Sequence, residues 1–305
     1  MKEPKFVDVG GTTTRYFEAG HGDPLLLIHG GAPGGVESAY DWSANFDELS
    51  ARFHVYALDK LGMGYTDNPE DDAGYSMART VEHVHQFMLA VRLDGAVVMG
   101  HSRGGLPAAR IAVDHPNLVR ALVVVDSNTL AAEHPLTPKD FYTKLSASAP
   151  AVPDETSIRR RLEANSYSTE HITGDFIDEM LRIAHLAKTQ DARVAMRQRV
   201  SPQFRASVRE VKYQTLDSIR AGLLKAPTLI VGGLNDPSAP VVLGYELFHH
   251  ISLVVPQTQL HVFNQAGHYV YREHEHQFDR LVIDFAEGIG TSTALPRRTA
   301  VPLPV

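Results

Sequence analysis

Residues 96–105 read AVVMGHSRGG, an apolar run followed by a G-x-S-x-G sequence. The run predicts a buried strand that ends at Met99, and the small residues after it predict a helix over about 104–115. The glycines on either side of the serine permit the strained backbone of a tight strand–turn–helix connection. We therefore expect the hydroxyl of Ser102 at the carboxyl edge of a sheet, where it can act as a nucleophile.

Short apolar strands alternate with helices on both sides of this sequence. The predicted helices of this part cover residues 79–93, 104–115 and 274–288. The predicted strands, of which the first two form a hairpin, cover residues 6–9, 13–18, 25–28, 53–58, 95–99, 121–125, 227–231 and 259–263. Strands that alternate with helices build parallel sheets covered on both faces. The expected fold class is therefore α/β, with a mostly parallel central sheet flanked by helices.

The strand pattern stops between residues 129 and 222. Amphipathic helical stretches are predicted there at 155–165, 173–189 and 190–199. We interpret 129–222 as a helical lid inserted before the last strands of one core, which comprises 1–128 and 223–290. The run Arg159-Arg160-Arg161 is interpreted as the solvated face of a lid helix. Residues 291–305, with several prolines, are expected to form a disordered tail.

The composition excludes several classes of protein. Lys and Arg total 29 against 36 Asp and Glu, a formal net charge of -7, whereas a general nucleic-acid binder needs a basic surface. The lack of cysteine excludes disulfides, thiolate metal sites and a cysteine nucleophile. No apolar run is long enough for a bilayer span, and the charged first residues do not resemble a signal peptide. We expect a cytoplasmic protein without nucleic-acid or membrane partners and without a metal or organic cofactor; a homodimer stays open.

A serine hydroxyl needs an oriented base to become a nucleophile. Asp236 and His268 each follow one of the late predicted strands, so the sheet would bring both to the edge that carries Ser102. Each alone would be unremarkable, since aspartate is common in turns and the chain has 16 histidines. Asp126, at the end of the predicted strand 121–125, is the alternative acid, although it more simply begins the insertion.

A second glycine-rich segment follows the predicted strand 25–28 and reads HGGAPGG at residues 29–35. Hydrolysis through a tetrahedral intermediate needs hydrogen-bond donors aimed at the developing oxyanion. The backbone N–H groups of Gly31 and of Arg103, the residue after the serine, are the natural pair. Gly31 has no side chain, so its backbone can approach the reacting atoms closely.

Taken together, these residues resemble the α/β-hydrolase superfamily, in which nucleophile, acid and base follow one another in the order found here. The HGGAPG sequence at 29–34 is similar to the HGGGPG loop of the meta-cleavage product hydrolases. Those enzymes split a carbon–carbon bond in the dienoate products of aromatic ring opening. The sequences GHY at 267–269 and FDRLVIDF at 278–285 resemble that branch as well.

The monoalkyl phthalate hydrolases share this loop but cleave carboxylic esters, above all mono(2-ethylhexyl) phthalate. The wide spacing of serine, aspartate and histidine is similar to that group. Two departures weaken the resemblance to the carbon–carbon hydrolases: His101 stands where they usually carry Asn, and the Asn of their W-S-N sequence is displaced to Asn45. Tyr269 replaces their usual Trp after the catalytic histidine, and Arg182 is the nearest match to their lid arginine.

The resemblance implies a serine hydrolase with Ser102 as nucleophile, His268 as base and Asp236 as its orienting acid. The predicted substrate is a small aromatic ester, most simply a monoalkyl phthalate whose free carboxylate meets the guanidinium of Arg103. The further substrate-binding candidates are Ala32, His101, Arg182 and Tyr269. Carbon–carbon hydrolysis of a meta-cleavage product is the first alternative. A ligand receptor or a cofactor-free oxygenase on the same fold is the second.

Overall fold

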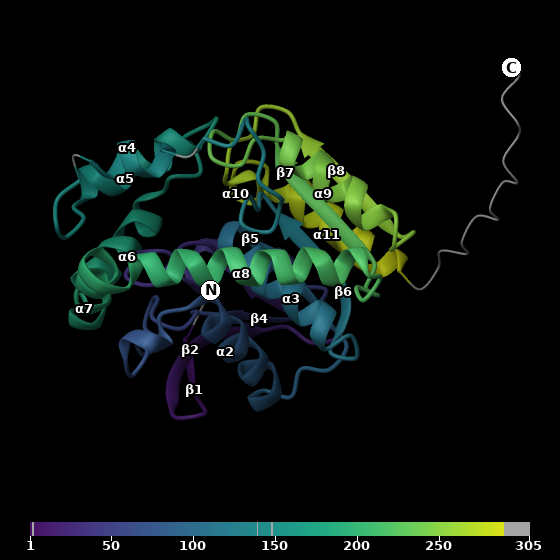
Figure 1. Cartoon of the computed structure of the whole chain (residues 1–305), viewed down its shortest axis with the longest axis horizontal. Coiled ribbons are helices and arrows are strands. Elements are labelled where there is room, and N and C mark those ends of the chain that lie inside the picture. Colours follow the sequence, from purple (N-terminus) through teal and green to yellow (C-terminus); the bar gives the residue numbers. More distant parts are fainter. Residues whose placement is uncertain (2, 139, 148, 290–305) are drawn as a thin grey trace, which may run out of the picture.

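The computed structural model describes residues 1, 3–138, 140–147 and 149–289. Its centre is an eight-stranded sheet with the order β1-β2-β4-β3-β5-β6-β7-β8 (Figure 1). The strands are β1 (Lys5–Val9), β2 (Thr12–Ala19), β3 (Pro24–Ile28), β4 (His54–Leu58), β5 (Ala96–His101), β6 (Val119–Val125), β7 (Thr228–Gly233) and β8 (Thr258–Phe263).

Only the two pairs that involve β2 run antiparallel, with Val9 opposite Thr12 at the hairpin turn and Tyr16 opposite Leu58. The remaining neighbours pair in parallel. The predicted α/β class with a mostly parallel sheet is thus confirmed.

Helices cover both faces of the sheet because its central strands are apolar on both sides. In β3, Leu25 and Leu27 join one core cluster, whereas Leu26 and Ile28 join the other. The first face is covered by α1 (Phe46–Ser50) and α11 (Glu275–Gly288). The second face is covered by α2 (Met77–Ala90), α3 (Gly105–Asp114), α8 (Ser201–Arg220) and α9 (Val242–Ser252). Short helical turns are η1 (Ala39–Trp42), η2 (Asp72–Gly74), η3 (Ser102–Gly104) and α10 (Val270–Glu273).

The described residues between β6 and β7 form helices and no strand. In order they are α4 (Phe141–Ser146), α5 (Glu155–Asn165), α6 (Gly174–His185), α7 (Ala187–Ala195), the π-helical stretch η4 (Met196–Val200) and α8. Figure 1 shows α4 to α7 grouped on one side of the sheet, whereas α8 crosses in front of it. Helix α8 packs on α2 and α3, so the last part of the segment predicted as a lid lies in a layer of the core.

Two further predictions concern the C-terminal tail and membrane-spanning helices. The tail predicted at 291–305 lies outside the described residues. Within the described part, no helix combines the length and apolar character that a bilayer span requires.

Candidate active site

Ser102 lies at the turn between β5 and α3. Its φ of 52° falls in the left-handed region that residues with a side chain rarely adopt. The turn requires its glycines, because a Cβ at Gly100 would lie 2.2 Å from the carbonyl oxygen of Gly104. A Cβ at Gly104 would lie 2.2 Å from the carbonyl oxygen of Ile28. The surrounding backbone thus enforces the strained conformation of the serine, which is common at functional sites.

An aspartate–histidine pair lies at the same edge of the sheet. His268 Nδ1 is 2.6 Å from Asp236 Oδ2, and both side chains are buried. The other carboxylate oxygen of Asp236 accepts the N–H of Ser238 at 2.7 Å and the N–H of Ala239 at 2.9 Å. Burial alone would raise the pKa of Asp236, but the charge of His268 and these hydrogen bonds hold it below its ordinary value. The aspartate is therefore charged and fixed in the orientation that directs the imidazole.

The backbone of His268 is also fixed by two contacts. Its N–H donates to the carbonyl of Asn165 at the end of α5 (2.7 Å), and its carbonyl accepts from His101 Nε2 (2.9 Å). Because a carbonyl only accepts, His101 carries its proton on Nε2. Burial, together with the nearby His268, lowers the pKa of His101 well below its ordinary value, so it is neutral. His101, predicted to bind substrate, is thus the residue that holds the loop of His268.

Asp126, the alternative acid, is buried next to Asp236 and forms no hydrogen bond with His268 among the described residues. Its Oδ1 accepts the N–H of Gly233 at 2.9 Å, and its Oδ2 has no hydrogen-bond partner within the described residues. Burial and the negative charge of Asp236 raise the pKa of Asp126 well above its ordinary value. Asp126 is therefore a protonated neighbour of the pair.

The glycine-rich loop after β3 lies beside the serine. A Cβ at Gly30 would lie 3.1 Å from the Cβ of Ser102. Gly31 has a φ of +75°, and a Cβ there would lie 2.5 Å from Glu37 Oε2. The backbone N–H of Arg103, the residue after the serine, lies in the helical turn that begins at Ser102, where such groups lack helical acceptors. Gly31 and Arg103 both line the same cavity as Ser102, and their role as oxyanion donors stays a prediction.

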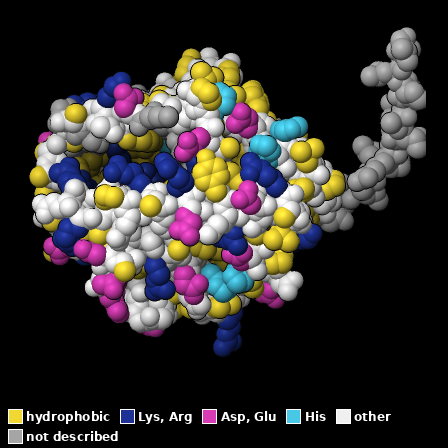
Figure 2. Space-filling view, viewed as in Figure 1, with side chains coloured by type: hydrophobic (Ala, Val, Ile, Leu, Met, Phe, Trp, Pro, Cys, Tyr) yellow, Lys and Arg dark blue, Asp and Glu magenta, His cyan; other side chains and the backbone are white. Residues whose placement is uncertain are grey.

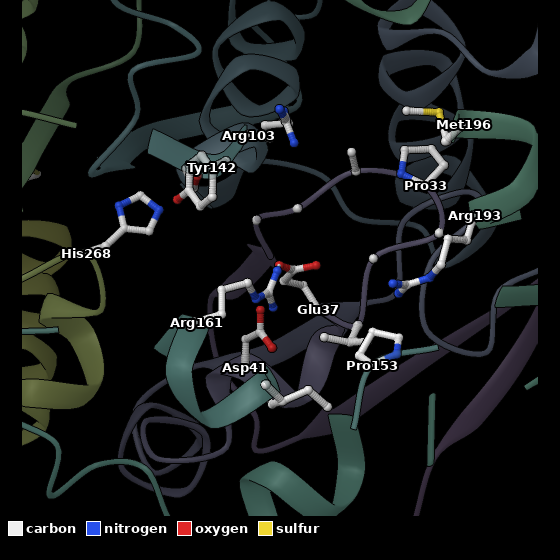
Figure 3. Close-up of a pocket in the computed structure, with 18 of the residues that line it drawn as sticks. Pro33, Glu37, Asp41, Arg103, Tyr142, Pro153, Arg161, Arg193, Met196 and His268 are labelled. Atoms are coloured by element: carbon white, nitrogen blue, oxygen red, sulfur yellow. The ribbon is translucent and has the colours of Figure 1, made fainter. Parts of the chain in front are cut away.

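These residues open onto one cavity of about 400 Å³. Ser102, His268 and four of the predicted binding residues line it: Ala32, His101, Arg103 and Tyr269. Figure 3 shows His268 at the left of this space, Arg103 above it, Arg161, Glu37 and Asp41 in its lower part and Arg193 at the right. A strained serine, a buried aspartate–histidine pair and a glycine-rich loop around one cavity form an arrangement suited to nucleophilic acyl chemistry.

Comparison with known proteins assigns the family. The model of the alpha/beta hydrolase fold family matches residues 23–275. The chain belongs to this family. It is a hydrolase of the α/β fold, as the sequence indicated.

Several relatives of this hydrolase have named activities. A 2-hydroxy-6-oxo-6-(2'-aminophenyl)hexa-2,4-dienoic acid hydrolase from Metapseudomonas resinovorans is 30% identical over 92% of this chain and 90% of its own length. A 2-hydroxymuconate semialdehyde hydrolase from Pseudomonas sp. strain CF600 is 30% identical over 90% of each chain. A meta-cleavage product hydrolase from Pseudomonas fluorescens IP01, solved as a serine-to-alanine variant with acetates, superposes with a TM-score of 0.76. It is 25% identical and the match covers 93% of this chain and 97% of that one.

Arg182 lies outside the cavity of this hydrolase. Its side chain is 59% exposed on α6 and pairs with Glu179 at 2.9 Å. It does not line the cavity, so the structure does not support its prediction as the lid arginine. Three other arginines, absent from the predicted site, line the cavity: Arg161, Arg193 and Arg197.

The interpretation of Arg159-Arg160-Arg161 as a solvated face is wrong for its last member. Arg161 Nη1 lies 2.5 Å from Glu37 Oε1, and its side chain is 25% exposed. The helical spacing could have revealed this, because Ile158 and Leu162 are the buried face of α5 and position 161 lies beside them. For Arg193 and Arg197 the chain offered no comparable local signal.

Proposed function

We propose that this hydrolase uses Ser102, His268 and Asp236 to cleave an acyl bond in a small substrate that carries a carboxylate. We infer further that the bond is the carbon–carbon bond of a 2-hydroxy-6-oxo-dienoate of the meta-cleavage type. The observation that carries the proposal is that arginines line the same cavity as the serine and histidine and, within the described residues, three of them form no ion pair. The relatives named above, with 30% identity over nearly whole chains, support the dienoate.

The chemistry follows from the geometry. Ser102 attacks the carbonyl carbon while His268 takes the hydroxyl proton, and Asp236 stabilises the imidazolium that forms. The backbone N–H groups of Gly31 and Arg103 stabilise the oxyanion. His268 then returns the proton to the leaving group, and a water activated by the same histidine releases the acid.

A carbon leaving group is harder to expel than an alkoxide, because its electron pair must be delocalised. In a dienoate the pair spreads toward the carboxylate end of the molecule. A guanidinium that binds this end would stabilise the charge as it develops, which is more useful for rate than binding the substrate alone. The positive charge of the cavity therefore suits the carbon–carbon reaction.

Ester hydrolysis of a monoalkyl phthalate is the second candidate, and two residues favour it. Asn45 donates to the carbonyl of Tyr271 (2.7 Å) and to Asp279 (2.9 Å) and does not line the cavity, so it cannot hold a dienoate. His101, in the position before the serine, has its Nε2 proton occupied by the carbonyl of His268. An alkoxide leaving group would not need the two asparagine side chains that the carbon–carbon hydrolases usually carry at these positions.

A panel of four substrates separates these possibilities. We would measure kcat/KM for 2-hydroxy-6-oxo-6-phenylhexa-2,4-dienoate, monobutyl phthalate, dibutyl phthalate and nitrophenyl butyrate, with Ser102→Ala as the blank. The proposal expects the dienoate to be the best substrate. A higher value for monobutyl phthalate would select the ester reaction. Equal rates of wild type and Ser102→Ala on all four would refute serine-dependent hydrolysis.

A further inference from the structure

The cavity holds more positive than negative charge. Its charged lining consists of Arg103, Arg161, Arg193, Arg197, Glu37 and Asp41. Arg161 and Glu37 neutralise each other in an ion pair. Burial raises the pKa of Asp41 to about 8, so this carboxyl is mostly protonated near neutral pH. Within the described part of the chain, no acid pairs with the other three arginines, which leave three uncompensated positive charges.

These three charges form two separate groups. Arg103 comes from the turn after β5, next to Ser102. Arg193 and Arg197 come from α7 and from the π-helical stretch that follows it. Figure 3 shows Arg193 on the side of the cavity opposite His268, and Arg103 above the space between them. Figure 2 shows Lys and Arg side chains gathered in a hollow of the surface in this region.

Near each group of arginines, the positive charge lowers the pKa of a neighbouring basic side chain. Burial, together with the charge of Arg103, lowers the pKa of Lys60 to about 7. Burial, together with the charge of Arg197, lowers the pKa of Arg193 to about 10. Arg193 Nε is buried without a hydrogen-bond partner in the described residues. Like charges that crowd one another, with the one charged acid nearby already paired to Arg161, indicate a place for an anion.

The position of Arg193 is fixed by the backbone. A Cβ at Gly34, which has a φ of +75°, would lie 2.6 Å from the backbone nitrogen of Arg193. The helix α7 therefore packs directly on the glycine-rich loop that also contains Gly31. This contact places the second group of charges at a fixed position relative to the serine.

We propose that the cavity binds a substrate with two carboxylates, one held by Arg103 and the other by Arg193 and Arg197. This inference rests on the proposed function and specifies its substrate class. The acyl group to be cleaved lies at the Arg103 end, next to Ser102. For a dienoate, Arg193 and Arg197 would hold the carboxylate of the dienoate chain. The carboxylate held by Arg103 would then belong to the substituent on the other side of the ketone that Ser102 attacks. A monoanion would leave one of the two groups uncompensated.

Competitive inhibition of a neutral reporter reaction tests this proposal without knowledge of the natural substrate. We would follow hydrolysis of nitrophenyl butyrate in the presence of linear dicarboxylates from glutarate to sebacate and of their monomethyl esters. A charge-assisted hydrogen-bond pair is worth about ten- to a hundredfold in affinity. We expect one chain length to inhibit at least about tenfold better than its monomethyl ester.

Matched variants identify the two sites. Arg103→Met and Arg193→Met should each abolish the advantage of the dicarboxylate, whereas Arg182→Met, which removes an exposed arginine outside the cavity, should keep it. Calorimetric titration of Ser102→Ala with the best dicarboxylate gives the same comparison without turnover, and circular dichroism checks that each variant is folded.

The outcomes distinguish this inference from the proposed function. If nitrophenyl butyrate is hydrolysed but dicarboxylates and monomethyl esters inhibit equally, the dicarboxylate inference is overturned and the serine chemistry stands. If the reporter is not hydrolysed but the Ser102→Ala protein prefers the dicarboxylate, the binding site stands and the proposed function fails. A preference that survives both Arg103→Met and Arg193→Met would also overturn the inference.

Discussion

Two buried aspartates, Asp236 and Asp126, lie side by side at the candidate active site and differ in charge. Asp236 is charged because His268 and two backbone N–H groups stabilise the carboxylate. Asp126 receives one backbone N–H and faces the negative charge of its neighbour, so it keeps its proton. The environment of each residue, which the sequence does not reveal, decides which of them can serve the histidine.

This difference predicts how substitutions in the triad behave. Ser102→Ala and His268→Ala should each lower kcat by on the order of 10⁴-fold, and the double variant little more, because the two residues act as one unit. Asp236→Asn should cost less than either. Asp126→Asn should cost less than about tenfold, because an amide resembles a protonated carboxyl in shape. Steady-state kinetics with nitrophenyl butyrate measure all five variants. A greater loss for Asp126→Asn than for Asp236→Asn would mean that Asp126, and not Asp236, is the acid that orients His268.

At the scale of elements, α5 touches two parts of the site at once. Its last residue, Asn165, accepts the N–H of His268, and its Arg161 pairs with Glu37. Glu37 lies against Gly31, whose added Cβ would meet its carboxylate. The helix therefore connects the base and the oxyanion loop.

The Arg161–Glu37 pair predicts a non-additive effect. Arg161→Met leaves a largely buried carboxylate without its partner beside the predicted oxyanion donors. It should lower both kcat/KM and the free energy of unfolding, the latter by about 1–3 kcal/mol. The double variant Arg161→Met with Glu37→Gln removes the unpaired charge and should recover part of both losses. Urea unfolding and nitrophenyl butyrate kinetics of the two single variants and the double variant measure the coupling. Additive losses would mean that the pair is a solvated contact without influence on the loop.

The sheet was predictable from the sequence because its strands are continuous apolar runs such as Leu25 to Ile28. Helix α8 was not predicted, because polar residues dominate its sequence, although Phe204, Val211 and Ile219 lie on one buried face of the helix. The positions of Ser102, Asp236 and His268 at one edge of the sheet could be predicted because each lies in the segment that follows a parallel strand. Arg193 could not, since its place in the cavity depends on how α7 packs on Gly34, 159 positions away in the chain.

For the whole molecule, buried carboxyl groups link stability to pH. Asp279 of α11 accepts from Asn45 at 2.9 Å, its other oxygen lacks a partner in the described residues, and it is 1% exposed. Burial raises its pKa to about 8. Because the folded pKa exceeds the unfolded value, the stability contributed by the protonated form is complete below about pH 4. It is lost as the pH rises toward 8.

The variant Asp279→Asn should therefore gain stability relative to the wild type as the pH rises from 5 to 8. The gain should approach on the order of 1.4 kcal/mol for each pH unit in which only the folded form holds the proton. The free energy of unfolding of the variant should still fall somewhat as the pH rises, because the pKa of Asp41 is also raised. Urea unfolding at four pH values across this range measures it. Parallel curves for variant and wild type would show that Asp279 titrates normally.

The order of the strands along the chain determines when the site can become active during synthesis on the ribosome. Ser102 follows β5 at the centre of the sheet, whereas His268 follows β8 at its edge and 166 residues later. A nascent chain can thus form the strained serine turn long before the ribosome has added the histidine that would activate it. The proposed nucleophile stays inert until β8 has paired with β7, so hydrolytic activity during synthesis should appear only with the last part of the chain.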